Sequence, residues 1–287
     1  SKMFQKPLVA FLHLIVYIGF VIINIELIEI VIDGLFGTHR ILSFLGWFYD
    51  FLIASFEFLA FLVLISVIIF LIRRNIIKVK RFIQSEMKGW PTLDGNLILI
   101  FEIFLMLAFL TMNAADSILQ TSYPEKYITA GSFPISSFFI APLLINLDVN
   151  VLMMIERFCW WFHIIGILGF LNYLAISKHL HILLAFPSTY YSKLEPKGQF
   201  SNMDSVTKEV KIMLDPNADP FSQNLENQTE SFGAKDVTDL SWLQLLNAYS
   251  CTECGRCTSE CPANITGKKL SPRKIMMDVR DRVEEVG

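Results

Sequence analysis

Four cysteines near the C-terminal end have the residue type and the spacing to bind a redox centre. Three stand at intervals of three and the fourth precedes a proline, giving Cys251, Cys254, Cys257 and Cys261-Pro262. This C-x₂-C-x₂-C-x₃-C-P run is the pattern by which soft thiolate ligands hold a [4Fe–4S] cluster. Structural zinc and a disulfide knot are the alternatives, but zinc sites usually separate two ligand pairs by roughly a dozen residues or more. The spacing therefore favours the iron–sulfur cluster.

The composition indicates a membrane protein in a reducing compartment. Of the 287 residues, 53% are hydrophobic and 25 are phenylalanine, and the net charge is only −3. The mean hydropathy is +0.49, which exceeds that of an ordinary soluble chain. Because the cysteine motif contains all cysteines except Cys159, we expect thiols rather than disulfides, with Cys159 an inert buried thiol.

Long apolar segments predict a bundle of membrane-spanning helices. A span needs about 20 residues, and four segments are long enough: 8–32, 47–72, 96–115 and 151–186. A shorter stretch at 133–147 is expected to be interfacial or half-inserted, which gives four to five spans. Pro187 is expected to end the last helix. By the positive-inside rule, the basic residues after the second segment place that loop and the N-terminus in the cytoplasm: Arg73, Arg74, Lys78, Lys80, Arg81 and Lys88.

Histidines form a second candidate centre. Four of the five lie in or beside the spans, and b-type haem takes axial histidines from neighbouring helices. On one continuous helix, His163 and His181 would share a face about 27 Å apart, which suits two centres stacked across a bilayer. The first and last helices run antiparallel and place His13 and His181 about 8–9 Å inside their cytoplasmic ends. A haem iron could therefore lie between His13 and His181.

The other histidines leave alternatives open. His179 is rotated by about 160° from His163 on an ideal helix, so it is either a ligand beside a local kink or a partner for a quinone or haem propionate. His39 is the only histidine on the side of His163, and it lies at a turn. Hydrogen-bonded packing is the alternative for each histidine. Glu26 and Glu29 either relay protons to a quinone or hydrogen-bond helices to one another.

Several stretches resemble a known family. Residues 241–246, 251–263, 267–274 and 277–281 resemble the ferredoxin-like part of heterodisulfide-reductase-related iron–sulfur proteins. Residues 173–187 resemble the last span of the nitrate-reductase gamma-type cytochrome b domain fused to such proteins, which uses two histidines spaced like His163 and His181. The resemblance covers nearly the whole chain except its polar linker. It implies the electron-transfer-flavoprotein:menaquinone oxidoreductase type, which passes electrons from acyl-CoA oxidation to menaquinone.

The chain departs from that family in two respects. Family members carry a second cysteine motif and cysteine-rich repeats, whereas this sequence stops at Gly287. We therefore expect an incomplete copy of a longer protein, with a second cluster if the chain continues. In two-cluster ferredoxin folds the fourth cysteine ligates the other cluster, so the cluster that Cys261 ligates stays open. The second span also lacks a histidine, which leaves open whether one or two haems bind.

These observations predict a mainly α protein with three parts. A transmembrane haem b domain spans 1–187, a cytoplasmic linker spans 188–239, and an α-helical ferredoxin-like iron–sulfur domain spans 240–287. We expect a multi-pass oxidoreductase of the bacterial inner membrane, with its N-terminus and [4Fe–4S] cluster on the cytoplasmic side. It would pass electrons through haem b between the cluster and menaquinone or another quinone.

The expected partners follow from the same prediction. The soluble electron donor would be electron-transfer flavoprotein or another iron–sulfur subunit, and we expect membrane lipid but no nucleic acid as a partner. No catalytic side chain is assigned. The alternative from a different class is a non-catalytic membrane anchor or redox sensor with a structural cluster. A channel or transporter is disfavoured because it leaves the cysteine motif unexplained.

Overall fold

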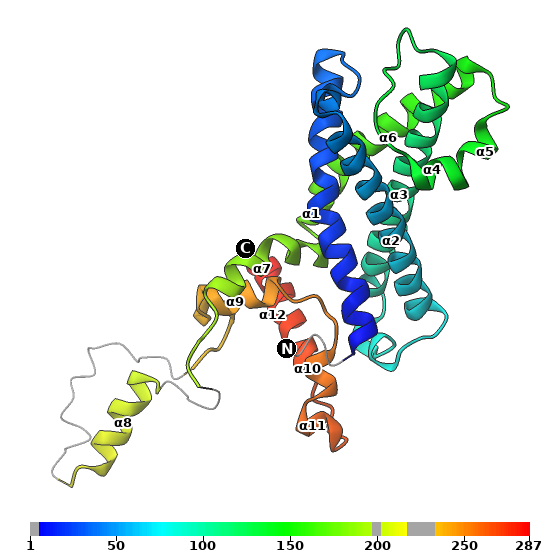
Figure 1. The fold of residues 1–287 in the computed structure, drawn as a ribbon. Coiled ribbons are helices and arrows are strands. Elements are labelled where there is room, and N and C mark those ends of the chain that lie inside the picture. Colours follow the sequence, from blue (N-terminus) through cyan, green and yellow to red (C-terminus); the bar gives the residue numbers. More distant parts are fainter. Residues whose placement is uncertain (1–5, 197–201, 217–232) are drawn as a thin grey trace. The chain divides into compact units, whose positions relative to one another are not determined.

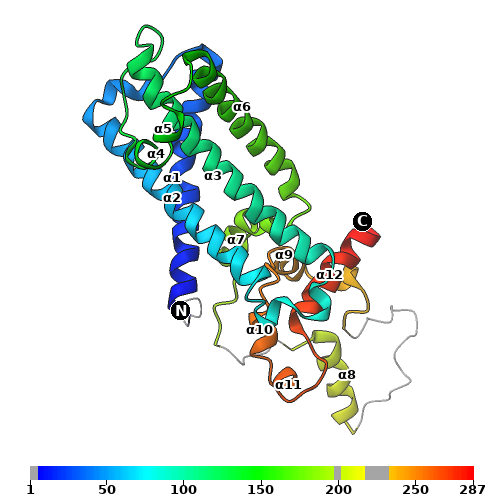
Figure 2. The same cartoon turned by 90° about the vertical axis from the view of Figure 1, so that its right-hand side faces the viewer.

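A computed structural model describes residues 6–196, 202–216 and 233–287, which form helices and connecting loops without a strand. The chain divides into two compact units, Ser1–Ser177 and Lys178–Gly287, which are seen from two sides in Figures 1 and 2. The predicted mainly α fold is confirmed for the part of the chain described. The three predicted domain ranges stay a prediction.

Four long helices form the first unit: α1 (Pro7–Phe36), α2 (Trp47–Asn75), α3 (Trp90–Ser122) and α6 (Val149–Leu174). All four are long and apolar enough to cross a membrane, as predicted. α2 packs against both α1 and α3, and α3 packs against α6 (Figure 1). Two glycines of α1 allow close approach, because a Cβ atom at Gly19 would collide with Val63 of α2 and one at Gly34 with Trp160 of α6.

The apolar side chains of these helices point both inward and outward. Ile53, Ala60 and Phe109 are buried in the core between the helices. Phe51 and Phe158 remain 61% and 68% exposed. A helix that is apolar around its whole circumference is suited to hydrocarbon on its outer side and to helix packing on its inner side. The apolar outer surface of the bundle, like the length of its helices, is therefore that expected of a membrane-spanning domain.

Short helices connect the spans. η2 (Ile41–Leu45) joins α1 to α2, and η3 (Lys80–Phe82) and η4 (Ser85–Met87) lie between α2 and α3. The stretch predicted to be interfacial folds as α4 (Pro134–Phe139) and α5 (Ala141–Leu144). α1 and α3 continue four and seven residues beyond their predicted ends at Ile32 and Ala115, to Phe36 and Ser122. The prediction was short there because an apolar run measures the hydrocarbon region, whereas a helix can continue in polar contacts beyond it.

The predicted single helix over 151–186 is wrong. α6 ends at Leu174, and η5 (Lys178–Leu180) precedes a separate helix, α7 (His181–Tyr190). Buried Asp94 of α3 contributes to this break, since it accepts hydrogen bonds from Tyr173 Oη (2.5 Å) and Ser177 Oγ (2.6 Å). His163 and His181 therefore do not share the face of one helix. The rotation of His179 relative to His163, which also assumed one helix, does not apply either. Pro187 does not end a helix either, because it lies inside α7.

The longer helices of the second unit are α7, α8 (Asp204–Leu214), α9 and α12. α9 packs against α7 and against α12. Ser241 and Gln244 form a capping box at the start of α9, which satisfies backbone donors that the first turn leaves unpaired. The bounds are η6 (Val237–Asp239), α9 (Trp242–Tyr249), α10 (Arg256–Ser259), α11 (Pro262–Ile265) and α12 (Pro272–Val286).

One helix interrupts the predicted linker. α8 (Asp204–Leu214) lies inside the range 188–239, where the sequence predicts little regular structure. Its apolar residues Val206, Val210 and Met213 recur at helical spacing, a short signal that the surrounding polar residues obscure. Residues 197–201 and 217–232 of the predicted linker lie outside the described residues.

Candidate redox centre

The four cysteines lie on one connection of the second unit. Cys251 and Cys254 follow α9, Cys257 lies in the single turn of α10, and Cys261 is the N-cap residue of α11. All four are free thiols, and Cys257 is exposed. Two short helices separated by tight turns therefore bring the whole predicted ligand set onto one loop.

Left-handed backbone conformations shape this loop. Glu253 and Gly255 have φ values of 54° and 71°, and for a non-glycine residue that conformation is uncommon and concentrates at functional sites. The Glu253 backbone forms a hydrogen bond with Cys251 that favours its thiolate form. Hydrogen bonds to cluster sulfurs are among the features that tune iron–sulfur centres. The loop backbone thus stabilises the thiolate form of Cys251.

The thiols of this loop lie close enough to influence one another. Burial raises the pKa of Cys251, and the neighbouring Cys254 and Cys257 raise it further. A cluster offsets such mutual repulsion because its iron ions bind thiolates. Within residues 6–196, 202–216 and 233–287, no three His, Cys, Asp or Glu side chains are grouped as one metal ion needs. The thiols of Cys251, Cys254 and Cys257 are the donor type that iron–sulfur clusters require, and the cluster site stays a prediction from their spacing.

Charged side chains surround Glu253 within the second unit. Its carboxylate, 2% exposed, accepts a hydrogen bond from Arg280 Nη2 at 2.9 Å and one from Lys178 Nζ. Arg273 is fully buried, and its Nη1 lies 3.5 Å from the Glu253 carbonyl oxygen. The sequence analysis did not select any of these four residues. The sequence feature that could have pointed to these contacts is Glu253 itself, an acidic residue between Cys251 and Cys254.

His181 is oriented by a backbone group. Its Nδ1 lies 3.0 Å from the carbonyl oxygen of Lys178, so Nδ1–H donates and Nε2 is left as the nitrogen that can ligate a metal. Burial lowers the pKa of His181, which favours the neutral imidazole that metals bind. The ring of His179 stands edge-on to it, with the ring centroids 5.5 Å apart. The second unit therefore presents a histidine pair in which Nε2 of His181 is the nitrogen that the Lys178 carbonyl leaves unused, and its role as a haem ligand stays a prediction.

His163 lies in the first unit with an unsatisfied nitrogen. It is 4% exposed, and its Nδ1 has no hydrogen-bond partner among the described residues. The nearest aromatic neighbour is Phe109, with ring centroids 6.2 Å apart. An unpaired buried polar atom is costly and marks a place where a further group belongs. The unpaired nitrogen leaves His163 available to a further group, and its role as a haem ligand stays a prediction.

The other two histidines have different surroundings. His39 Nε2 lies 2.9 Å from Asp116 Oδ1, and His39 Nδ1 accepts from the backbone N–H of Ile128 at 3.2 Å. Both ring nitrogens are therefore engaged in hydrogen bonds, and ligation of a haem would require one of them to be released. His13 lies on α1 and is exposed. The pairing of His13 with His181 joins the two units and stays a prediction.

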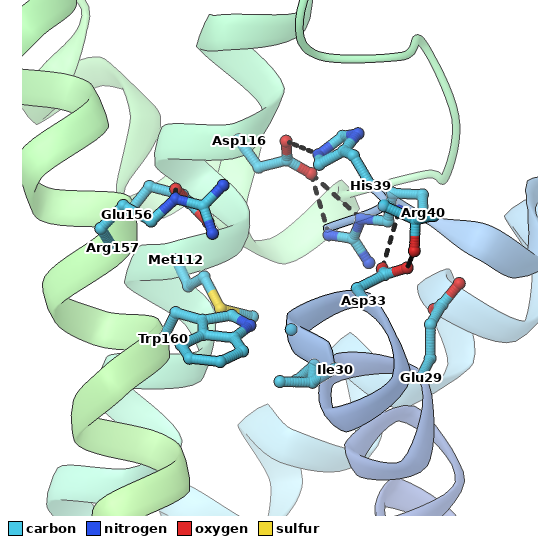
Figure 3. Close-up of a pocket in the computed structure, with 12 residues that line it drawn as sticks. Glu29, Ile30, Asp33, His39, Arg40, Met112, Asp116, Glu156, Arg157 and Trp160 are labelled. Carbon is cyan, nitrogen blue, oxygen red and sulfur yellow. Dashed lines mark hydrogen bonds and ion pairs between the residues drawn. The ribbon is translucent and has the colours of Figure 1, made fainter. Parts of the chain in front are cut away.

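A buried arginine gathers polar groups where α1 ends and α2 begins, as Figure 3 shows in part. Arg40 lies 2.9 and 3.1 Å from Asp116, 3.2 Å from Glu26 and 2.9 Å from Asn113. Its Nη1 also lies 3.4 Å from Tyr49. Burial alone would lower the pKa of Arg40, but its anionic neighbours, Asp116 first, raise it well above its ordinary value. This Arg40 network was not predicted from the sequence, although Glu26 was.

Further carboxylates extend the Arg40 network between helices. Glu29 accepts from the Leu42 backbone at 2.9 Å and from Tyr49 Oη at 2.9 Å. Glu57 accepts from Asn113 and from the start of α4. The adjoining cavity has a volume of about 50 Å³, which holds a few water molecules and is too small for a quinone. It is lined in part by Glu29, Asp33, His39, Arg40, Asp116, Glu156 and Trp160 (Figure 3).

Comparison with curated proteins gives three relatives. The chain is 32% identical over 287 residues to "Probable iron-sulfur-binding oxidoreductase FadF" of Bacillus subtilis, covering 100% of this chain and 36% of that protein. It is 26% identical over 279 residues to "EtfAB:quinone oxidoreductase" of Syntrophomonas wolfei, covering 95% and 34%. A 56-residue match of 36% identity to "Probable membrane-anchored ferredoxin" of Chromohalobacter salexigens covers 20% and 8%.

These relatives support a family of membrane iron–sulfur oxidoreductases. The chain spans about a third of the length of the first two relatives. No family model matches it, and no solved structure matches it significantly. At this level the predictions of an oxidoreductase, an iron–sulfur cluster and membrane helices are supported, whereas haem and quinone are not shown.

Proposed function

We propose that this chain passes electrons between a [4Fe–4S] cluster and the quinone pool of a membrane, through haem b. The cysteine loop carries this proposal, because Cys251, Cys254 and Cys257 are near enough to interact electrostatically and belong to the unit that directly follows four membrane-spanning helices in the chain. Cys251, Cys254 and Cys257 would hold the cluster, while Cys261 would ligate the same cluster or a second one. The cluster supplies one-electron transfer when bound.

Two histidines support the haem part of the proposal. The buried His163 has an unpaired Nδ1, and His181 has its Nδ1 fixed by a backbone carbonyl. Fixing one imidazole nitrogen orients the other toward a metal. His13, His39 and His179 would be the candidates for the remaining haem ligands. Haem, when bound, supplies a second one-electron carrier, and the protein's task is to orient these histidines and exclude water from them.

The partners and the location follow from the relatives and from charge. The name "EtfAB:quinone oxidoreductase" supports electron-transfer flavoprotein as the soluble donor and a quinone as the acceptor, and menaquinone is our proposal for that quinone. Arg73 and Arg74 lie in the last turn of α2, and such basic flanks favour the cytoplasmic side. We place the protein in the bacterial inner membrane, with both its N-terminus and the cysteine loop in the cytoplasm.

A reduced-minus-oxidised visible spectrum of the detergent-purified chain tests this function. We expect a b-type haem band that appears on reduction with quinol, together with iron–sulfur absorbance. His163→Ala and His181→Ala should each weaken the haem band, and Cys254→Ser should remove the cluster signal and keep the haem. Cys159→Ser is the matched cysteine control, since Cys159 lies in α6 outside the motif. A cluster signal with no haem band and no response to quinol would instead support the membrane anchor or redox sensor.

A further inference from the structure

A continuous series of contacts joins the cysteine loop to His181 inside the second unit. The Glu253 backbone is hydrogen-bonded to Cys251, and the Glu253 carboxylate forms an ion pair with the side chain of Lys178. The carbonyl of Lys178 in turn accepts the Nδ1–H of His181. One residue therefore contacts the candidate cluster site through its side chain and the candidate haem ligand through its backbone.

We propose that Lys178 is the positioning residue that sets the spacing and the electronic coupling between the cluster loop and His181. This inference rests on the proposed function, in which the loop holds a cluster and His181 ligates haem iron. Electron transfer between two centres requires a fixed distance, and small displacements of reacting groups have large effects on rate. Lys178 fixes both ends of that distance.

The burial of the ion pair argues against an incidental surface contact. The side chains of Lys178 and Glu253 are only 10% and 2% exposed. Bringing two charges out of water costs more than a surface pair gains, so such pairs add little stability in comparison with apolar packing. Arg280 already forms an ion pair with Glu253 at 2.9 Å, so Lys178 is a second cation on one carboxylate. Arg280 is itself shared with Asp281, 3.6 Å from its Nη2.

The charges around Glu253 also favour an anionic cluster. Lys178 and Arg280 pair with the Glu253 carboxylate, and Arg273 Nη1 lies 3.5 Å from the Glu253 backbone carbonyl. Arg280 also pairs with Asp281, so three cations stand against two carboxylates beside the cysteine loop. A cluster held by thiolates is anionic and gains a negative charge on reduction, and nearby net charge helps to set its reduction potential. Removing the Lys178 ammonium should therefore lower the cluster's midpoint potential, and removing the Glu253 carboxylate should raise it.

Four variants of the full chain separate these effects. Lys178→Met removes the charge and keeps the length of the side chain, whereas Lys178→Arg retains the charge and should restore function. Glu253→Gln removes the opposite charge. Lys274→Met is the matched control, because Lys274 is 57% exposed and pairs with Asp278 at the surface of the same unit. Each purified protein is titrated while its cluster is followed by electron paramagnetic resonance.

The rate measurement mixes pre-reduced protein with a soluble quinone analogue and follows cluster and haem reoxidation. In Lys178→Met we expect cluster reoxidation to slow by about tenfold or more, since displacements of ~1 Å can cost up to ~100-fold. The cluster potential should fall, haem reoxidation should stay near that of the unsubstituted protein, and Lys178→Arg should restore both cluster values. Glu253→Gln should shift the cluster potential in the opposite direction.

The outcomes distinguish this inference from the proposed function. If the unsubstituted protein shows no haem band or no cluster signal, the proposed function fails and the inference fails with it. If both centres are present and Lys178→Met behaves like Lys274→Met in potential and rate, the inference alone is overturned. Should Lys178→Met fail to fold, Glu253→Gln still tests the charge effect, and an unchanged cluster potential there would contradict the proposal.

Discussion

The Arg40 network and the Glu253 contacts are both buried and charged, but their stoichiometry is opposite. In the first unit one guanidinium is shared by Asp116 and Glu26, with Glu29 and Glu57 in contacts close by. In the second unit one carboxylate is shared by Lys178 and Arg280. Excess carboxylate suits hydrogen bonding within and between helices, whereas excess cation suits an anionic cofactor.

The two networks also differ in which elements of their units they connect. Arg40 lies in the connection between α1 and α2 and bonds to Glu26 of α1 and Asp116 of α3. These contacts hold three membrane-spanning helices in one arrangement. The contacts of Glu253 reach the start of the unit at Lys178 and its last helix at Arg280. The first network therefore holds the bundle together, and the second surrounds a loop whose proposed role is to bind a cluster.

The largest effect is expected from Arg40→Met. Removing the guanidinium leaves Asp116 and Glu26 buried without their cation, and breaking a buried pair from one side costs about 3–5 kcal/mol. The free energy of unfolding in detergent should fall by that amount, while the cluster signal of folded protein stays unchanged. Arg40→Lys should recover part of the loss, because it restores charge without the forked geometry. A stable Arg40→Met protein would show that this network does not hold the bundle together.

Glu253→Ala should have a smaller effect on stability and a larger one on the cluster. The substitution removes the carboxylate that pairs with Lys178 and Arg280, and leaving a charged group unsatisfied costs about 2–3 kcal/mol. The cysteine loop should also lose its left-handed turn, because the Glu253 side chain holds that conformation from two sides. Iron content and cluster absorbance measure this effect. Equal losses of bundle stability in Glu253→Ala and Arg40→Met would remove the contrast between the two regions.

The sequence predicted the parts that depend on local pattern. Hydropathy located four spans, and the spacing of Cys251, Cys254 and Cys257 located the candidate cluster. It did not predict the ion pair of Lys178 with Glu253 or the contact of Arg40 with Asp116, whose partners are separated by 75 and 76 positions. Such pairs depend on which helices become neighbours, and no local periodicity encodes that.

The break after α6 shows the same limit at a single position. Ala175 and Ile176 continue the apolar character of the span, so hydropathy predicts an uninterrupted helix there. The hydroxyl groups of Tyr173 and Ser177 instead bond to Asp94, about 80 residues earlier in the chain, at 2.5 and 2.6 Å. A tertiary contact overrides the local preference. The same break places His181 at the start of a new helix, where its Nδ1 reaches the Lys178 carbonyl.

The N-cap residue of α9 tests whether the stability of that helix affects the cysteine loop. Ser241 caps α9, the helix that leads to Cys251, and replacing such a serine with alanine costs about 1 kcal/mol. Ser241→Ala should lower the unfolding free energy of the second unit by that amount without shifting the cluster potential. Ser192→Ala is a suitable control, since Ser192 is exposed and its hydroxyl donates to the Thr189 carbonyl within the same unit. A shifted potential in Ser241→Ala would mean that helix stability, rather than the charges around Glu253, tunes the site.

The smallest effect is expected from mild acid, and its sign follows from His181. Burial lowers the pKa of this residue below its ordinary 6.5, so the unfolded chain binds more protons than the folded one. Stability should therefore decrease as the pH falls through about 6.5 and level off below the folded pKa. Unfolding of the haem-free protein measured at pH 7.5 and at pH 5.5 should show a loss smaller than that of Ser241→Ala. The loss should be absent in His181→Gln.

The surface ion pair of the same unit provides the control for that pH window. Hydrogen bonds from Arg282 lower the pKa of Asp236 to about 2, and a carboxylate with a lowered pKa stabilises the fold above its unfolded pKa of about 3.9. Its contribution is lost only as the pH falls below that value, outside the window in which His181 titrates. Asp236→Asn should therefore leave the difference between pH 7.5 and 5.5 unchanged. A changed difference in this variant would assign the acid sensitivity to the exposed pair instead of the histidine that Lys178 orients.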